Sequence, residues 1–167
     1  MSVPTDPDDL DFGATLKGLR PELRMFDRYT LSRQLGRGGM GVVWLGYDER
    51  LHREVALKFL PEMVQGDVVS LDELREETTR SLALTHPNIV RIHDLAEEAG
   101  IAAIVMEYVA GRTLSELRVP KPGKVFEVPE ITTWIEQLCA ALTYAHGRKI
   151  VHRDLKPSNL MIDGEGL

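Results

Sequence analysis

A glycine-rich run between two predicted strands narrows the folds open to this chain of 167 residues more than any other feature. The run reads GRGGMGVV over residues 36–43 and fits the pattern G-x-G-x-x-G-x-V, in which backbone N–H groups can approach phosphates closely. A dinucleotide-binding fingerprint would open a helix after its glycines, and a Walker loop would end in Gly-Lys-Ser/Thr. Here a strand follows and the Walker ending is missing, so neither fold is expected. Taken alone, the run could also be a glycine-rich hairpin turn.

Runs rich in Val, Leu, Ile and aromatic residues predict three strands joined by tight turns, and later a hairpin of two more. A single helix is predicted between them, over 70–86, because Ser70 and Glu73 form a capping box ahead of apolar residues at near-helical spacing. The expected fold class is therefore α+β, beginning with a five-stranded antiparallel sheet and one helix. The predicted strands cover 29–36, 41–48, 53–60, 88–98 and 101–109.

The last third of the chain is predicted to be mainly helical. Apolar residues recur every three or four positions along 130–149, which is typical of a helix with one buried face. The sequence TLSEL over 113–117 predicts a short helix, and a Pro- and Gly-bearing connector follows it. The apolar stripe consists of Ile131, Trp134, Ile135, Leu138, Leu142 and Ala145.

The first 27 residues carry six acids against three bases, with Pro and Gly scattered among them. This composition predicts a largely disordered acidic arm over 1–27. The stretch 16–26 could add a short helical turn that docks on the following domain, but Gly18 and Pro21 oppose a long helix.

Composition and charge exclude several classes of protein. The 26 acidic residues outnumber the 20 Lys and Arg residues, for a net charge of -6, so the chain lacks the basic surplus that favours nucleic acid as a partner. Cys139 is the single cysteine and the N-terminus does not read as a secretion signal, so a cytoplasmic setting is expected. The longest apolar run, IAAIVM, is too short to span a membrane.

The sequence VALK places Ala56 and Lys58 on one face of the predicted third strand. A lone lysine in a strand is usually a solvated charge, but a lysine beneath a glycine-rich flap has a phosphate to meet. The helix that follows offers Glu73, Glu76 and Glu77, and one of these carboxylates would hold the lysine in position. The other two are expected to lie on an exposed helical face.

The stretch HRDLKPSN, residues 152–159, places three groups suited to phosphoryl transfer on one short loop. Asp154 could accept a hydroxyl proton, Lys156 could meet the transferring phosphoryl group, and the amide oxygen of Asn159 suits Mg²⁺. A His-Arg-Asp triplet alone would normally be a surface turn. Eight residues of this composition between two strand-like apolar runs are hard to assign to chance.

Taken in order, the glycine-rich run, VALK, the glutamate-bearing helix, HPNIVRIHD, MEYVAG and HRDLKPSNLMI resemble the eukaryotic-like protein kinases of bacterial type. The lysine two residues after Asp154 is typical of the serine/threonine class. The resemblance implies a kinase small lobe over 28–108, and a hinge with the start of an incomplete, mainly helical large lobe over 109–167. It also implies ATP and Mg²⁺ as cofactors and a protein as substrate.

The resemblance also assigns roles to the matching residues. Asp154 would be the catalytic base, Lys156 would stabilise transition-state charge, and Asn159 would bind a metal ion. Lys58 would contact the α- and β-phosphates. The remaining contacts to adenine and phosphates would come from Gly36, Gly38, Gly41, Val43, Ala56, Met106, Glu107, Val109 and Met161.

Glu77 would be the ion-pair partner of Lys58, because the family's glutamate lies nine residues before the position occupied by His86. Glu76 is the second choice. Met106 would be the gatekeeper residue ahead of the hinge.

The chain departs from the family pattern at its end, because the Asp of Asp-Phe-Gly, a further magnesium ligand, would fall beyond Leu167. Asp11-Phe12-Gly13 is expected to be a chance match in the acidic arm. We therefore expect the 167 residues alone to be inactive or nearly so, and marginally stable because the apolar stripe of 130–149 lacks partner helices. The alternative is a non-catalytic, kinase-like module that binds nucleotide or pairs with an intact kinase.

Overall fold

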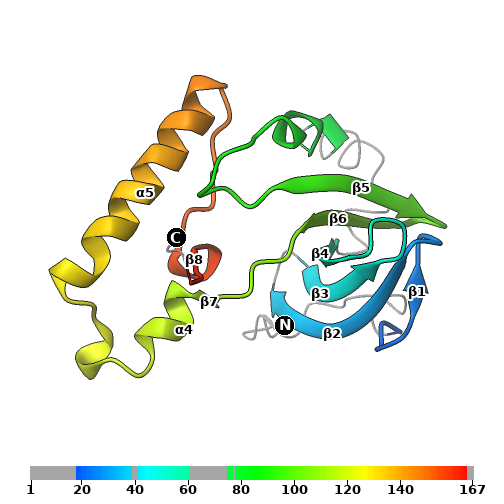
Figure 1. Ribbon diagram of the computed structural model, residues 1–167, viewed down its shortest axis with the longest axis horizontal. Coiled ribbons are helices and arrows are strands. Elements are labelled where there is room, and N and C mark those ends of the chain that lie inside the picture. The colour runs from blue at the N-terminus through cyan, green and yellow to red at the C-terminus, as the bar shows by residue number, and fades with distance from the viewer. Residues whose placement is uncertain (1–17, 39–40, 61–74, 77, 165–167) are drawn as a thin grey trace, which may run out of the picture. The chain divides into compact units, whose positions relative to one another are not determined.

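The computed structural model describes residues 18–38, 41–60, 75, 76 and 78–164 (Figure 1). They fall into two compact units, the first within Met1–Ala83 and Ile92–Tyr108 and the second within Leu84–Arg91 and Val109–Leu167. Residues 84–91 thus belong to the second unit, a division that the sequence did not suggest. No helix among the described residues combines the length and the apolar character needed to cross a membrane.

The first unit is built on an antiparallel sheet of six strands in the order β1-β2-β3-β4-β6-β5 (Figure 1). All five predicted strands are present, which confirms the predicted α+β class, and a short edge strand is added. The strands are β1 (Arg24–Met25), β2 (Tyr29–Gly38), β3 (Gly41–Asp48), β4 (Arg53–Phe59), β5 (Ile92–Glu98) and β6 (Ile101–Glu107).

Residues 18–27 were expected to continue the disordered arm or to add a short helical turn that docks on the following domain. They do pack on that domain, but through the strand β1 and not through a helix. Met25 pairs with Tyr29 of β2, and the ring of Phe26 stacks on that of Phe59 with centroids 6.2 Å apart. Burying a large apolar side chain is worth about 1.5–3 kcal/mol, which offsets the entropy lost when this segment is ordered. The apolar residues of the segment that pack on the core are Leu19, Leu23, Met25 and Phe26.

The hydrophobic core lies on one face of this sheet. Trp44, Leu57 and Val105 are lateral neighbours on β3, β4 and β6, and all three are buried. Because side chains alternate along a strand, the residues directly before and after each of these three project to the opposite face of the sheet. The buried cluster consists of Tyr29, Leu31, Val42, Trp44, Val55, Leu57, Phe59, Ala96, Ala103 and Val105.

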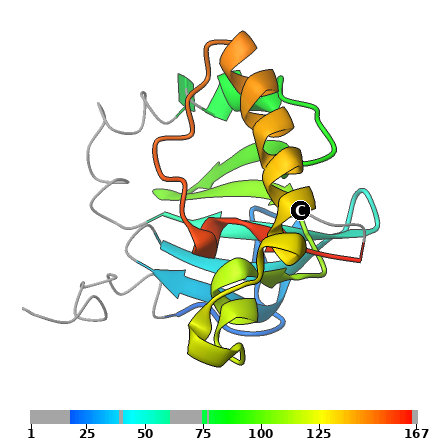
Figure 2. The same cartoon turned by 90° about the vertical axis from the view of Figure 1, so that its left-hand side faces the viewer.

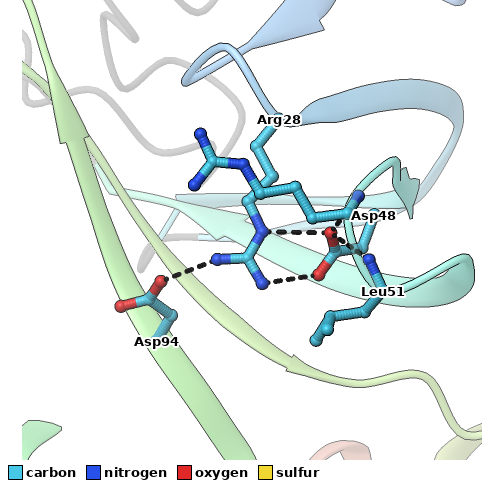
Figure 3. A network of polar contacts seen from close by, with 5 residues as sticks. Arg28, Asp48, Leu51 and Asp94 are labelled. Carbon is cyan, nitrogen blue, oxygen red and sulfur yellow. Dashed lines mark hydrogen bonds and ion pairs between the residues drawn. The ribbon is translucent and has the colours of Figure 1, made fainter.

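A charged network ties together three parts of the first unit (Figure 3). Asp48, whose side chain is 1% exposed, accepts two hydrogen bonds from Arg28, at 3.0 Å from Nε and 2.8 Å from Nη2. It also accepts the backbone N–H groups of Arg50 and Leu51, and Arg28 reaches Asp94 on β5 at 3.4 Å. Burial alone would raise the pKa of Asp48, but the bonds from Arg28 and the two amides outweigh it and lower that pKa.

The predicted helix over 70–86 is only partly described. Residues 75, 76 and 78–82 are helical, and a turn follows at Ala83, so the helix ends four residues earlier than predicted. Arg75 pairs with Glu97 of β5 at 3.0 Å, and Thr78 is buried, so this helix packs on the sheet. Residues 70–74 and Glu77 lie outside the described residues.

The second unit contains two α-helices among its described residues, as predicted, and a small two-stranded sheet (Figures 1 and 2). The short helix α4 begins with a capping box, in which Thr113 and Glu116 exchange hydrogen bonds between side chain and backbone. The elements are β7 (Arg112–Thr113), α4 (Leu114–Arg118), η2 (Pro122–Lys124), α5 (Val128–Gly147), η3 (Pro157–Asn159) and β8 (Met161–Ile162).

Helix α5 is the long helix that the apolar stripe predicted over 130–149, and it begins two residues earlier, at Val128, and ends two residues earlier, at Gly147. Ala141 and Ala145 are its buried residues, whereas Ile135 of the stripe is 49% exposed. Near its C-terminus, the hydroxyl of Tyr144 accepts the backbone N–H of Thr85 at 3.2 Å. This contact attaches the segment 84–91 to α5 and explains why the segment belongs to the second unit.

Candidate active site

The strand register gathers five of the predicted nucleotide contacts of the first unit on the face opposite the core. Val43 lies opposite Gly36 on one side and Lys58 on the other. Ala56 lies opposite Met106 on β6. Residues directly opposite each other in an antiparallel pair project to the same face. Ala56 and Lys58 are two positions apart on β4 and also share a face, so Gly36, Val43, Ala56, Lys58 and Met106 all lie on one surface. The sequence predicted that Ala56 and Lys58 share a face, and the register extends that face across four strands.

Two glycines shape the flap at the end of β2 and the start of β3. Gly38 pairs with Gly41, and Gly41 adopts φ +119°, a conformation that residues with a side chain rarely adopt. A Cβ atom on Gly41 would lie 1.9 Å from the carbonyl oxygen of Phe59. Gly36, in contrast, has open space around the position of a Cβ atom. Gly41 is therefore required by the fold, whereas Gly36 is not.

The predicted partner of Lys58 remains a prediction. Lys58 is half-buried on β4, and Glu77 lies outside the described residues. The second choice, Glu76, is 76% exposed, and its carboxylate lies 3.9 Å from the guanidinium of Arg80 one turn along the helix. This contact is typical of a solvated helical face, which is the alternative that the sequence left open.

The predicted hinge residues divide between the units. Glu107 is the exposed last residue of β6, and Tyr108 ends the first unit. Val109 begins the segment 109–167, the longer of the two segments that make up the second unit. Its side chain is half-buried, and its carbonyl accepts a hydrogen bond from the backbone N–H of Gly111 at 3.0 Å.

In the second unit, the structure brings the three predicted loop residues into direct contact. The ammonium group of Lys156 lies 2.8 Å from Oδ2 of Asp154. The side-chain amide of Asn159 donates to the same oxygen at 3.0 Å and to the backbone carbonyl of Asp154 at 2.9 Å. The hydrogen bond from Lys156 is the main reason why the pKa of Asp154 is lowered; burial opposes it, and the bond from Asn159 adds to the lowering. Asp154 is therefore a carboxylate at neutral pH.

A scaffold that the sequence did not reveal holds this loop. Strand β7 pairs with β8, and the backbone N–H of Leu114, at the start of α4, donates to the carbonyl of Leu160 at 2.9 Å. A Cβ atom on Gly111 would lie 2.4 Å from the carbonyl oxygen of Ile162, so only glycine allows this close approach of two backbones. The sequence shows Gly111 as one more loop glycine, and no local pattern indicates its distant neighbour.

Residues 29–167 match the family described as the protein kinase domain. The chain belongs to this family. It is 43% identical over 143 residues to the serine/threonine-protein kinase PrkC of Bacillus subtilis, which covers 86% of this chain and 22% of that protein. The serine/threonine-protein kinase PknF of Mycobacterium tuberculosis is 41% identical over 138 residues, covering 82% of this chain and 29% of that protein. The solved PknI kinase domain of M. tuberculosis gives a TM-score of 0.78 at 30% identity, covering 89% of this chain and 59% of that one.

These comparisons confirm the resemblance to bacterial-type serine/threonine kinases that the motifs indicated, and they confirm the kinase-like fold. The chain spans less than a third of the length of the two curated relatives. The matched region begins at Tyr29, so β1 and the segment before it lie outside the family match.

The kinase family implies Mg²⁺ and ATP, and the loop chemistry fits a metal ion. Both hydrogen bonds of the Asn159 side chain use its amide nitrogen, which leaves the amide oxygen Oδ1 as an oxygen ligand of the kind that Mg²⁺ prefers. Within the described part of the chain, no three His, Cys, Asp or Glu side chains gather into a metal-binding group. Asn159 is thus the donor that the kinase loop offers, together with the adjacent carboxylate of Asp154.

Proposed function

We propose that this chain is the catalytic part of an ATP-dependent serine/threonine protein kinase, which transfers a phosphoryl group from Mg-ATP to a Ser or Thr hydroxyl. The observation that carries the proposal is the contact between Asp154, Lys156 and Asn159 on one short loop. A carboxylate that could act as base, with a cation and a side-chain amide both hydrogen-bonded to it, provides groups that phosphoryl transfer requires. The family match supports the same reaction.

In the first unit, the face opposite the core is proposed to hold the nucleotide. The backbone N–H groups around Gly36, Gly38 and Gly41 would bind phosphate oxygens, since no side chain there obstructs their approach. Lys58 would contact the α- and β-phosphates, and we keep Glu77 as its proposed ion-pair partner. The contacts to the base proposed from this unit are the side chains of Val43, Ala56 and Met106 and the backbone of Glu107. Met161 and the backbone of Val109, which belong to the second unit, are also proposed as contacts, from the family resemblance.

In the second unit, Asp154 is proposed to act as the base. Its carboxylate accepts the proton of the substrate hydroxyl while the hydroxyl oxygen bonds to the γ-phosphorus, and the bond from that phosphorus to the leaving oxygen of ADP breaks. Lys156 stabilises the negative charge on the transferring group. Mg²⁺, when bound at Asn159, supplies further neutralisation of phosphate charge.

The proposed partners are ATP and a protein substrate, with pairing to a second kinase chain as an additional proposal. A cytoplasmic setting is proposed from the single cysteine, because disulfides are rare in reducing compartments. The alternative function, a non-catalytic module that binds nucleotide, keeps the first-unit contacts and drops the role of Asp154.

The test separates nucleotide binding from transfer. Titration of the 167-residue chain with Mg-ATP measures affinity, with Lys58→Met expected to weaken it at least tenfold and Asp154→Asn expected to leave it nearly unchanged. Transfer to a generic Ser/Thr substrate is measured on the protein as its gene encodes it, where Asp154→Asn should abolish the signal. Binding that survives in Lys58→Met would contradict the proposed nucleotide site. Transfer that survives in Asp154→Asn would contradict the proposed base, and binding without any transfer would support the module.

A further inference from the structure

Strand β2 contains two irregularities in its pairing with β3, and they flank Arg33 and Gln34. The register shifts once between Leu31 and Arg33 and again between Gln34 and Gly36. A bulge inserts one extra residue into a strand, bends it, and moves the next side chain to the other face. Bulges next to active sites often serve to re-aim a side chain. These two lie directly before the flap glycines.

The first bulge decides where Arg33 points. Tyr29 and Leu31 project into the core, so strict alternation would send Arg33 into the core as well. Instead Leu31 pairs with Gly46 and Arg33 with Leu45, which are consecutive residues of β3 and project to opposite faces. The bulge therefore places an arginine on the face that carries the proposed nucleotide contacts.

On that face, Arg33 reaches the far side of the sheet. Its guanidinium Nη2 donates a hydrogen bond of 3.1 Å to the hydroxyl of Tyr108, which is 75 residues away in sequence. Arg33 lies in a lateral row with Leu45, Ala56 and Met106, and Tyr108 follows that last residue by two positions. The bond thus spans the width of β3 and β4 and joins β2 to the chain that leaves β6.

We propose that the bond from Arg33 to Tyr108 is a latch that retains the bound nucleotide by holding the flap-bearing strand to the end of β6. This inference rests on the proposed nucleotide site. In the sheet order, β3 and β4 lie between β2 and β6, and the two bulges bend β2 next to Arg33. In this proposal β2 moves away from the end of β6 when the nucleotide is released, and that movement breaks the bond. Arg33 and Tyr108 are positioning residues, because they act through the strand they restrain.

The latch has a measurable consequence for the kinetics of release. The bond is exposed, so we take the lower part of the usual range for a hydrogen bond, about 0.5–1 kcal/mol, which corresponds to a change of roughly two- to fivefold in a rate or equilibrium constant. If the bond must break before release, its loss accelerates dissociation by this factor and leaves association unchanged. A role confined to folding would instead lower thermal stability without this selective effect.

The experiment uses stopped-flow displacement of a fluorescent ADP analogue, with Mg²⁺, from the 167-residue chain. Tyr108→Phe removes only the hydroxyl, and Arg33→Met removes the donor while keeping an unbranched, uncharged side chain. Each is expected to raise the dissociation rate about two- to fivefold. The double variant should be no faster than the faster single variant, and Arg33→Lys should restore part of the retention.

Matched controls make the same chemical changes elsewhere in the first unit. Tyr47→Phe removes a hydroxyl from an exposed tyrosine of β3, and Arg53→Met removes an exposed arginine at the start of β4. Both should release the analogue at the wild-type rate. Wild-type release rates in Tyr108→Phe and Arg33→Met, or additive effects in the double variant, would overturn the latch alone. A wild-type chain that binds no nucleotide would overturn the proposed function and the latch with it.

Discussion

Replacing Asp48 by asparagine tests whether one buried carboxylate holds the start of the sheet together. The side chain is 1% exposed and accepts four hydrogen bonds, two from Arg28 and one each from the backbone N–H groups of Arg50 and Leu51. Asparagine preserves the shape and can keep the bonds to Oδ1. It places an amide N–H₂ group opposite Nη2 of Arg28, so a charged hydrogen bond becomes a contact between two donors.

The magnitude follows from burial and charge. A hydrogen bond to a charged group is worth about 1.5–3 kcal/mol, and removing one partner of a buried ion pair costs about 3–5 kcal/mol. Because the Arg28 side chain remains 22% exposed, we take the lower end and expect Asp48→Asn to reduce the free energy of unfolding by about 3 kcal/mol. Asp94 contacts the same arginine at 3.4 Å but is 47% exposed, so Asp94→Asn should cost less than about 1 kcal/mol.

Urea unfolding followed by tryptophan fluorescence measures both variants. The chain has two tryptophans, Trp44 in the first unit and Trp134 in the second, so a Trp134→Phe background confines the signal to the unit that contains Asp48. A cost below about 1 kcal/mol for Asp48→Asn, or an equal cost for Asp94→Asn, would refute the reasoning.

The same pair has a defined pH dependence. The pKa of Asp48 is lowered in the folded protein, so its contribution to stability is fully present above the unfolded-state pKa of about 4 and is lost as the pH falls through the lowered folded-state pKa. Asp48→Asn should therefore be less sensitive to acid than the wild type below about pH 4. Equal slopes of stability against pH in this range would contradict the assigned cause.

Three further substitutions probe the backbone and the capping of the site. Gly41→Ala should lower the midpoint of thermal unfolding by several degrees. The added Cβ atom would clash with the backbone of β4, and the strained φ alone costs about 1–3 kcal/mol. As a control, Gly36→Ala should leave the midpoint nearly unchanged, because there is open space at that position. Gly111→Ala should shift the backbone of β8 and slow phosphoryl transfer more than it weakens nucleotide binding, and Gly147→Ala, in open space, should do neither. Thr113→Ala removes the side-chain half of the capping box of α4 and should cost about 0.5–2 kcal/mol in urea unfolding, with Thr113→Ser close to wild type.

The strands of the first unit were predictable because alternation and turn residues are local signals. Strand β1 was not, since its apolar residues lie in an acidic segment broken by Gly18 and Pro21, and their burial depends on a core formed by distant strands. The bulges that place Arg33 opposite Leu45 were likewise invisible, because a one-residue shift leaves no local mark in the sequence.

The catalytic loop shows the opposite balance. Asp154, Lys156 and Asn159 were predictable as one short loop because they lie within eight consecutive residues. That Lys156 and Asn159 both bond to the Asp154 carboxylate was not predicted. Their support was not predictable, because Gly111 meets Ile162 through backbone atoms alone.

The two halves of the proposed chemistry are held in different ways, and the difference suits their tasks. In the first unit, Val43 and Lys58 are fixed by a backbone ladder whose other face is filled by buried side chains such as Trp44, so their spacing is rigid. In the second unit, the side chains of Lys156 and Asn159 are exposed. They are held by their bonds to the Asp154 carboxylate and not by packing against a buried core. Exposed bonds of this kind are weak against water, so they can be exchanged for a substrate hydroxyl and a metal ion at little cost. A rigid surface for binding and an exchangeable loop for proton and phosphoryl transfer are what the proposed reaction requires of each unit.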